Sequence, residues 1–403
     1  MAAWWRRWRP PTLADRFSTR DNAIGLLRLV LAGAVLVSHS WPLGLGEEDL
    51  GTTLTRRHTD LGTMAVYGFF VLSGFLITTS ALRFPPGRYA WHRFLRIFPG
   101  LWVCLLVTAF GFAPLVAWYE RGGLTGFWRH PEGPFRYVLV NALALINQYP
   151  ISGLLAHVPY ARLTGGRPTA FDGSLWSLRY ELGCYLVVGL LGAAAVLRRR
   201  PAVVLGLAGA TYAAVAVGWL RSPTGPPALG VLRVPLLGAF EVGQAVLLGL
   251  AFLLGAVLRL YRDRIPLHGA LAAGAGLLLA GSLWLGGLLV LGLPAYAYLL
   301  CYAAVALPRR LRRIGRRRDY SYGIYIYAFP VQQTLALVGG ARYGVGVFVL
   351  LSALGTAALA VPSWHFVERP ALAWKDRPAP GRPWRRRPAA PSEDQTGPAM
   401  LTR

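Results

Sequence analysis

The sequence predicts an all-α integral membrane protein, a bundle of about ten transmembrane helices with both termini in the cytoplasm. Hydrophobic residues make up 55% of its 403 residues and charged residues only 15%, whereas about 25% of a soluble domain is charged. Apolar runs recur along the chain, each reaching the ~18 residues that cross a hydrocarbon core about 30 Å thick. The basic residues lie in short clusters between these runs, as membrane topology requires.

The predicted spans follow one another closely, apart from the long outer loop 120–172. This loop contains the weaker apolar stretch FRYVLVNALALINQY, which we expect to be a partly embedded or lid-like segment. The boundary between the seventh and eighth spans is placed at Gly286 and Gly287, within a nearly continuous apolar run. The predicted spans are 23–45, 61–82, 94–118, 174–197, 202–220, 235–258, 266–282, 285–307, 320–339 and 344–366.

Three regions are expected: a basic cytoplasmic tail (1–22), a transmembrane domain (23–370) and a disordered basic cytoplasmic tail (371–403) rich in Pro, Arg and Ala. The formal net charge is +25. In the predicted orientation, 30 of the 42 Lys and Arg residues lie in cytoplasmic segments and 10 in outer ones, as the positive-inside rule demands. The basic charge therefore indicates topology, and nucleic-acid binding is not expected.

Two ionisable residues, Arg28 and His39, lie in the first span. A charge in a membrane costs roughly 2.5–3.5 kcal/mol on insertion scales, so it indicates function. Their spacing amounts to about three helical turns, which places both side chains on one face, about 16 Å apart along the axis. A neutral imidazole can accept a hydroxyl proton, so His39 is a candidate general base or acyl carrier. A histidine that only hydrogen-bonds a neighbouring helix is an equal alternative.

The second span contains GFFVLSGFLIT, residues 68–78. Ser73 and Gly74 are small residues among aromatic ones, which permits close approach of another helix backbone. Packing is the favoured interpretation of this motif, and Ser73 is kept as a candidate donor-binding residue.

The segment WHRFLRIFP precedes the third span and places Arg93 and Arg96 on one helix face. Paired guanidinium groups suit a phosphate-bearing ligand such as coenzyme A. From the residues alone, a topology signal that anchors lipid headgroups is the better explanation.

The fourth span opens with FDGSLWSLRYELGCYL, in which Asp172 and Ser174 are expected to cap the helix. Ser177 and Glu181 are four residues apart and share a face. We place Glu181 two turns inside the helix, near the outer surface, where it can orient an imidazole, act as an acid or bind an acceptor sugar. A structural pair with Arg28 or with another span is an equal alternative.

The other titratable residues carry weaker signals. Asp319 and Glu368 lie at predicted helix ends and are expected to be caps or arginine partners. Cys104, Cys184 and Cys301 lie in apolar runs without metal-like spacing and are expected to pack, not to form disulfides or bind metal. The sequence contains no metal-ligand cluster, phosphate-binding glycine loop or nucleophile elbow.

Together these segments resemble the acyltransferase 3 family of membrane-bound acyltransferases. The resemblance covers about residues 23–370 and rests on several motifs in a fixed order, each weak alone but specific as a set. The motifs are Arg28 with His39, FFVLSGFLIT, RFLRIFP, SLWSLRYEL, SYGIYIYAFPV and VERP.

The resemblance implies a ten-helix bundle that transfers an acyl group, commonly acetyl, from cytoplasmic acyl-coenzyme A to a hydroxyl. The implied acceptor is a carbohydrate or lipid-linked glycan reached from the outer face. His39 matches the catalytic histidine and Glu181 a residue of the site. Arg28, Arg93 and Arg96 match arginines that serve donor binding or site architecture. The arginine bias and the Ala and Gly content point to a GC-rich bacterium, and the expected location is the bacterial cytoplasmic membrane.

The sequence departs from the family pattern in the late motif, where relatives often have a histidine before the proline. Here Ala328 and Phe329 occupy that stretch, so no role is carried over. Two other functions stay open: a transporter or flippase for a glycan or lipid precursor, and a non-catalytic scaffold. Paired helices broken by Gly or Pro, a sign of transport, are absent from the sequence.

Overall fold

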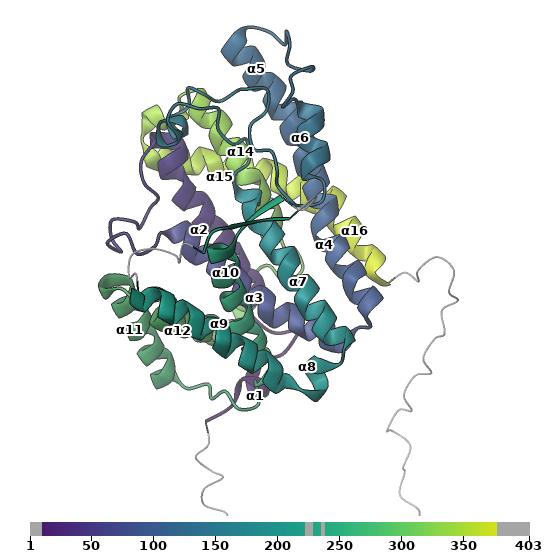
Figure 1. Cartoon of the computed structure of the whole chain (residues 1–403), viewed down its shortest axis with the longest axis vertical. Helices are drawn as coiled ribbons and strands as arrows, with labels where there is room; N and C mark the ends of the chain where they lie inside the picture. The colour runs from purple at the N-terminus through teal and green to yellow at the C-terminus, as the bar shows by residue number, and fades with distance from the viewer. Residues whose placement is uncertain (1–9, 222–228, 235–237, 377–403) are drawn as a thin grey trace, which may run out of the picture.

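Helices stand at all ten positions predicted for spans in this computed structural model, which describes residues 10–221, 229–234 and 238–376 (Figure 1). Seven described helical segments are long and apolar enough to cross a membrane. They are Ile24–Leu45, Leu61–Arg83, Pro86–Arg121, Pro201–Arg221, Val242–Leu260, Leu288–Ala306 and Val345–Ala373. By length and composition, these segments agree with the predicted helical membrane bundle.

Three predicted spans correspond to shorter helices: α7 (Leu178–Ala193), α11 (Gly269–Leu285) and α14 (Ser321–Leu337). The count of ten spans and the cytoplasmic placement of both termini therefore stay predictions. The boundary at Gly286 and Gly287 is confirmed, because α11 ends just before them and both adopt positive φ angles that favour glycine.

Short turns of 3-10 or π-helix connect or extend the longer helices. The helices that precede the long outer loop or lie within it are α1 (Leu13–Arg16), α2 (Ile24–Leu45), α3 (Leu61–Arg83), α4 (Pro86–Val107), η2 (Thr108–Phe112), α5 (Ala113–Arg121), α6 (Pro134–Asn141) and η3 (Pro159–Thr164). The elements after it, besides α7, α11 and α14, are η4 (Ser174–Ser177), α8 (Val196–Arg199), α9 (Pro201–Arg221), β1 (Val231–Val234), β2 (Gly238–Glu241), α10 (Val242–Leu260), η5 (Leu288–Gly292), α12 (Leu293–Ala306), α13 (Arg309–Arg312), η6 (Gly340–Tyr343), α15 (Val345–Pro362), η7 (Ser363–Glu368), α16 (Arg369–Ala373) and η8 (Trp374–Asp376).

The structure corrects the prediction before α10. Residues 238–241, expected to open the sixth span, form strand β2, which pairs antiparallel with β1 and brings Val231 opposite Glu241. The all-α prediction therefore omitted a two-stranded hairpin. Apolar residues at 231–241 suit a strand as well as a buried helix, so hydrophobicity alone did not distinguish them.

The described part of the N-terminal tail is folded against the bundle. Thr12 caps α1, Leu13 is buried, and the Leu13 amide donates to the Ile265 carbonyl at 2.9 Å. Of the predicted disordered tail 371–403, the segment to 376 is helical, and the rest lies outside the described residues.

The outer loop is held by its own polar side chains. The Asn141 side-chain amide donates to the backbone carbonyl of Gln148 at 2.7 Å. The Gln148 side-chain amide donates to the backbone carbonyls of Glu132 and Pro150, both at 3.0 Å. The α6 helix provides one wall of this arrangement. Whether the segment is embedded in the membrane stays a prediction.

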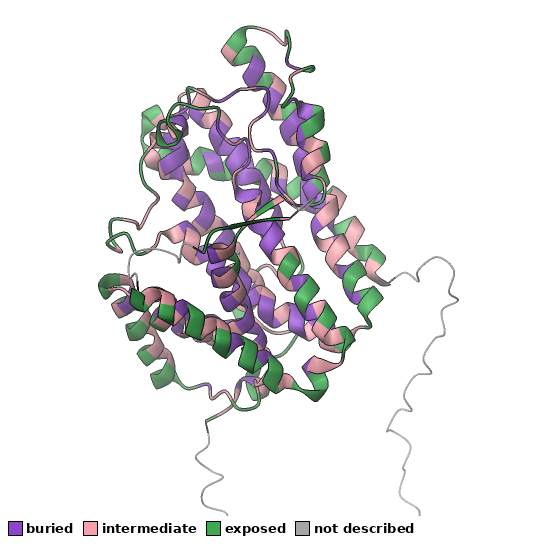
Figure 2. Ribbon diagram, in the orientation of Figure 1, coloured by how far each residue is buried: buried purple, intermediate pink, exposed green. Residues whose placement is uncertain are grey.

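Helix α3 lies at the centre of the bundle, where burial is greatest (Figure 2). A Cβ atom on Gly74 would stand 1.9 Å from the Phe252 carbonyl oxygen of α10, and one on Gly255 would stand 2.0 Å from that of Val71. The two glycines therefore allow α3 and α10 to touch through their backbones, which confirms packing as the role of Gly74.

We predict that Gly74→Ala destabilises the protein, because overpacking a close interface costs about 1–3 kcal/mol. The measurement is the thermal unfolding midpoint of purified protein in detergent. Gly249→Ala on α10 is the matched control, since a Cβ there meets open space. Equal midpoints for both variants would contradict the assigned packing.

Candidate active site

Five of the six predicted site residues line one large cavity of about 1050 Å³, here named the arginine cavity. It lies between α2, α3, α4, α7, the start of α14 and η7. The five residues are Arg28, Ser73, Arg93, Arg96 and Glu181, and the lining also includes Arg83, Arg88 and Lys375. The sixth residue, His39, lines a different cavity.

A single carboxylate ties two arginines of this cavity together. Asp319 Oδ2 lies 3.1 Å from Arg28 Nη1 and 2.7 Å from Arg96 Nη2, and Arg96 Nη1 also lies 3.6 Å from Glu368 Oε2. The expected arginine pairing of both acids is confirmed. Burial raises the pKa of Asp319, but the two guanidinium groups and hydrogen bonds from Ser321 outweigh it and lower that pKa to about 2.

Arg93 faces the arginine cavity without a carboxylate partner among the described residues. Its guanidinium lies over the Tyr185 ring at 5.8 Å, and its buried Nε has no hydrogen-bond acceptor. Ser80 Oγ and Trp364 Nε1, also in residues of the lining, are buried without partners. The Arg93 guanidinium, which lines the cavity without a carboxylate partner among the described residues, is therefore available to a ligand. Arg93 and Arg96 share this face, as predicted.

Glu181 lines both the arginine cavity and a smaller pocket that adjoins it. It accepts hydrogen bonds from Ser73 Oγ at 3.1 Å and from the Tyr185 hydroxyl at 2.5 Å. The α-helix begins at Leu178, so Glu181 is in its first turn, not two turns inside. Glu181 forms neither an ion pair with Arg28 nor a hydrogen bond with His39, and it is bonded instead to Ser73 on another predicted span.

A small pocket of about 40 Å³, the connecting pocket, continues inward from the arginine cavity. The two share Arg28, Ser73 and Glu181. Phe69 and Tyr325 narrow the pocket, with ring centroids 5.8 Å apart in an edge-on contact. Only a small group can therefore occupy the pocket.

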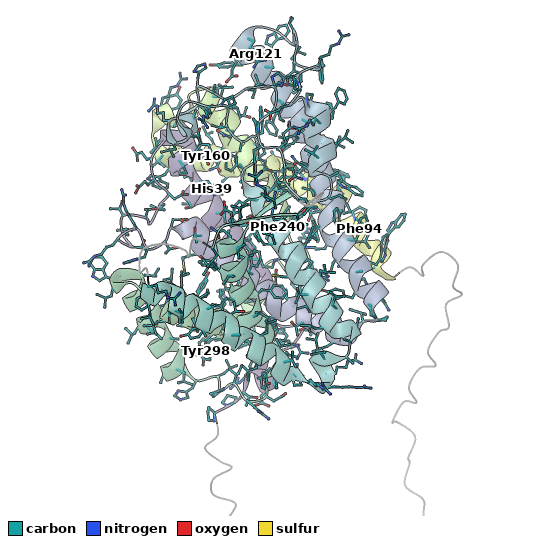
Figure 3. The ribbon with its side chains drawn as sticks, in the orientation of Figure 1. His39, Phe94, Arg121, Tyr160, Phe240 and Tyr298 are labelled. Carbon is teal, nitrogen blue, oxygen red and sulfur yellow. The ribbon has the colours of Figure 1, made fainter. Side chains whose placement is uncertain are left out.

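His39 lines a third space of about 130 Å³, the His39 cavity, which also borders Asp49, Asp60, Trp176 and Gln244. Val66 lines both this cavity and the connecting pocket. Arg28 and His39 thus both face the bundle interior, as their spacing predicted, but they line different cavities. Figure 3 shows His39 on the inner side of α2.

The His39 ring forms no hydrogen bond to another described residue, and its Nδ1 atom is buried. The structural alternative, a histidine tied to a neighbouring helix by a hydrogen bond, is therefore not observed. The ring instead meets Phe329 edge-on, with centroids 5.5 Å apart. Phe329 lies in the stretch where the sequence departs from the family pattern.

Two acidic residues from the loop before α3 stand beside His39. Asp60 caps α3 by accepting from the Thr63 amide at 2.7 Å, and Asp49 accepts from Ser38 Oγ at 3.0 Å. Burial, and next the nearby Asp60 charge, raise the pKa of Asp49 to about 6, although the Ser38 hydrogen bond opposes this. The sequence did not mark these acids, because they lie outside every predicted span.

Two minor expectations have mixed outcomes. Asp172 caps the turn before α7 through the Ser174 amide at 3.0 Å, whereas Ser174 Oγ, expected to share this role, is buried without a partner. The cysteines Cys104, Cys184 and Cys301 are all free thiols, as predicted.

Comparison with known proteins places the chain among acyltransferases. Residues 21–365 match the acyltransferase 3 family model, described as an acyltransferase domain. A protein named O-acetyl transferase from Shigella phage Sf6 is 26% identical over 87% of this chain and 96% of its own length. Nodulation protein 10 of Rhizobium leguminosarum bv. viciae is 28% identical over 89% of this chain and 95% of its own length. No solved structure matches the chain.

We predict that Asp319→Ala strongly destabilises the bundle, because it leaves the partly buried Arg28 guanidinium without a carboxylate and Arg96 with only the more distant Glu368, at a cost of about 3–5 kcal/mol. Glu48→Ala is the matched control, because its pair with Arg57 is exposed and such pairs contribute at most about 1 kcal/mol. Thermal unfolding in detergent compares the two variants. A small and equal shift in both would show that Asp319 does not organise the cavity.

Proposed function

Because this chain belongs to the acyltransferase 3 family and is an O-acyltransferase, we propose that it moves an acetyl group from acetyl-coenzyme A to a hydroxyl of a carbohydrate or lipid-linked glycan. The reaction would take place in the cytoplasmic membrane of a bacterium. The observation that carries the proposal is a series of three neighbouring spaces. The arginine cavity shares Arg28, Ser73 and Glu181 with the connecting pocket, and this pocket shares Val66 with the His39 cavity. Transport and scaffold functions have no comparable support.

The arginine cavity suits the donor. Its volume lies near the upper end of typical ligand pockets, roughly 300–1,000 Å³. Coenzyme A carries several phosphate charges, and guanidinium groups bind phosphates through paired hydrogen bonds. Arg93 is the best-placed group for this contact, since Arg28 and Arg96 already share Asp319. Arg28 and Arg96 then fix the cavity wall along the thioester path.

The position of the cavity agrees with the predicted orientation. It gathers residues from the start of α2, the end of α3 and the start of α4, which border segments assigned to the cytoplasm. His39, Asp60 and the outer loop lie toward the other ends of these helices. The donor therefore enters from the cytoplasm and the acceptor from outside.

The connecting pocket supports a short acyl group. A volume of about 40 Å³ has room for about three or four water-sized groups, since one such group needs roughly 10–15 Å³. An acetyl group, with its three heavy atoms, fits this space. The name of the Shigella phage relative, an O-acetyl transferase, agrees with that size.

In the proposed reaction, the acceptor hydroxyl oxygen attacks the thioester carbonyl carbon while His39 takes the hydroxyl proton. The new ester C–O bond forms, the C–S bond breaks, and coenzyme A leaves as a thiolate that receives the proton from the imidazolium. In the alternative route, the imidazole attacks the thioester carbonyl, the C–S bond breaks and coenzyme A leaves as a thiolate. The hydroxyl oxygen then attacks the acyl-imidazole, the C–N bond breaks, and the hydroxyl proton is passed to the thiolate as His39 is regenerated. Glu181, which holds the hydroxyls of Ser73 and Tyr185, positions the thioester end of the donor.

We predict that His39→Ala lowers acetyl transfer by roughly 10²–10⁴-fold, the contribution of a positioned general base, without weakening donor binding. Acetyl esters on envelope glycans are measured by mass spectrometry, and coenzyme A binding is measured on purified protein. His157→Ala, at an exposed loop histidine, is the control. Unchanged glycan acetylation in His39→Ala would refute the proposal.

Rapid-quench labelling with radioactive acetyl-coenzyme A distinguishes the two proposed routes, because only acyl transfer through His39 labels the protein.

We also predict that Phe69→Ala lets the enzyme use longer donors, such as butyryl-coenzyme A, because it widens the connecting pocket. Transfer rates with acetyl and butyryl donors are compared for wild type and variant. Phe366→Ala, with an 80% exposed ring outside the pocket, is the control. An unchanged preference for acetyl in Phe69→Ala would show that this pocket does not select the acyl group.

A further inference from the structure

A second large space lies beside the β1–β2 hairpin, on the same side of the bundle as His39. This hairpin cavity has a volume of about 570 Å³ and is bordered by the hairpin, the loop at 146–149 and the starts of α7 and α10. The residues that matter for its chemistry are Asn147, Tyr149, Trp176, Tyr180, Glu241 and Gln244. The proposed reaction as described above makes no use of it.

The hairpin cavity adjoins the His39 cavity. Trp176 and Gln244 line both spaces. A ligand that occupies the hairpin cavity can therefore extend one group between these two side chains toward His39. Gln244 also borders a third outer space, of about 250 Å³, so it stands where all three outer spaces meet.

The lining has the chemistry of a carbohydrate site. Tyr149, Trp176 and Tyr180 supply aromatic rings, against which the C–H face of a sugar packs. The side chains of Asn147, Trp176 and Gln244 form no hydrogen bonds to other described residues, so their donors and acceptors are available to hydroxyl groups. Pockets that combine a few such polar groups with aromatic walls are typical ligand sites.

The walls of the cavity are fixed by their own contacts. The Arg179 guanidinium donates to the carbonyl oxygens of Ala239 on β2 and Ile146 in the loop, which joins these two walls. The Glu241 amide donates to the Tyr180 hydroxyl at 3.1 Å, and Tyr180 meets Phe240, labelled in Figure 3, edge-on. Arg179, which lies within a predicted span, therefore shapes this cavity.

The charges at the inner end select against acidic groups. Asp49 and Asp60 line the His39 cavity, and its lining contains no Lys or Arg. A carboxylate or phosphate entering there would meet like charges. The sugar unit presented to His39 is therefore neutral, whatever the charge of the rest of the acceptor.

We infer that the hairpin cavity binds the acceptor as a neutral sugar ring that stacks on Trp176, with Gln244 directing one hydroxyl toward His39. This inference rests on the proposed function, since it identifies the acceptor site of that reaction. It makes Trp176 and Gln244 specificity-determining residues, and Arg179 a positioning residue that holds the hairpin.

The test uses the full-length protein in lipid nanodiscs and a panel of short neutral oligosaccharides. Binding to immobilised nanodiscs is measured, as is acetyl-coenzyme A consumption. Wild type binds at least one oligosaccharide. Trp176→Leu and Gln244→Leu weaken its binding roughly 10-fold or more, the loss of one central contact. Trp176→Phe, which keeps an aromatic face, retains most of it.

The controls separate this inference from the proposed function. Trp118→Leu, at an exposed ring outside the three outer spaces, leaves binding unchanged, and thermal unfolding verifies that each variant is folded. His39→Ala retains oligosaccharide binding and loses transfer. If no oligosaccharide binds wild type, or if Trp176→Leu and Gln244→Leu bind as wild type does, the inference is overturned even where acetyl-coenzyme A is consumed. Sugar binding without any use of acetyl-coenzyme A would instead overturn the proposed function.

Discussion

The shared ion pair at Asp319 determines the geometry of the donor side of this protein. One carboxylate oxygen receives Arg28 from α2 and Arg96 from α4, at the residue that leads into α14. Breaking a buried ion pair is strongly destabilising, so these contacts hold the three helices to one another. Arg93, one turn before Arg96, is consequently held toward the arginine cavity, where it has no carboxylate of its own.

Two neighbouring residues of α3 also have separate roles. Neighbouring residues on a helix point about 100° apart, so Ser73 and Gly74 serve different partners. Gly74 lets the backbone of α10 approach, while Ser73 donates to Glu181 on α7. A single short motif thereby sets the closest packing in the centre of the bundle and also one wall of the site. Packing and function are therefore not competing explanations of this motif.

Local periodicity was enough to predict the helices, the common face of Arg93 and Arg96 and the inward direction of Arg28 and His39. Local periodicity could not predict contacts between segments that are distant in the sequence. No spacing rule links Asp319 to arginines more than 200 residues earlier, because that pairing depends on how the helices pack. Glu181 was misplaced because a 3-10 turn delays the start of α7. The roles of the site residues remain predictions until they are tested by substitution.

The narrow passage between the two cavities matters for the energy balance of the cell. A membrane protein with cavities on both sides could conduct protons, and proton flow into the cell would dissipate the gradient that drives ATP synthesis. Phe69, Tyr325 and Val66 line the small connecting pocket between the arginine cavity and the His39 cavity, and apolar groups at a constriction resist wetting. In the proposed orientation, an acetyl group passes from the cytoplasmic side to the outer side of the membrane without a flow of ions.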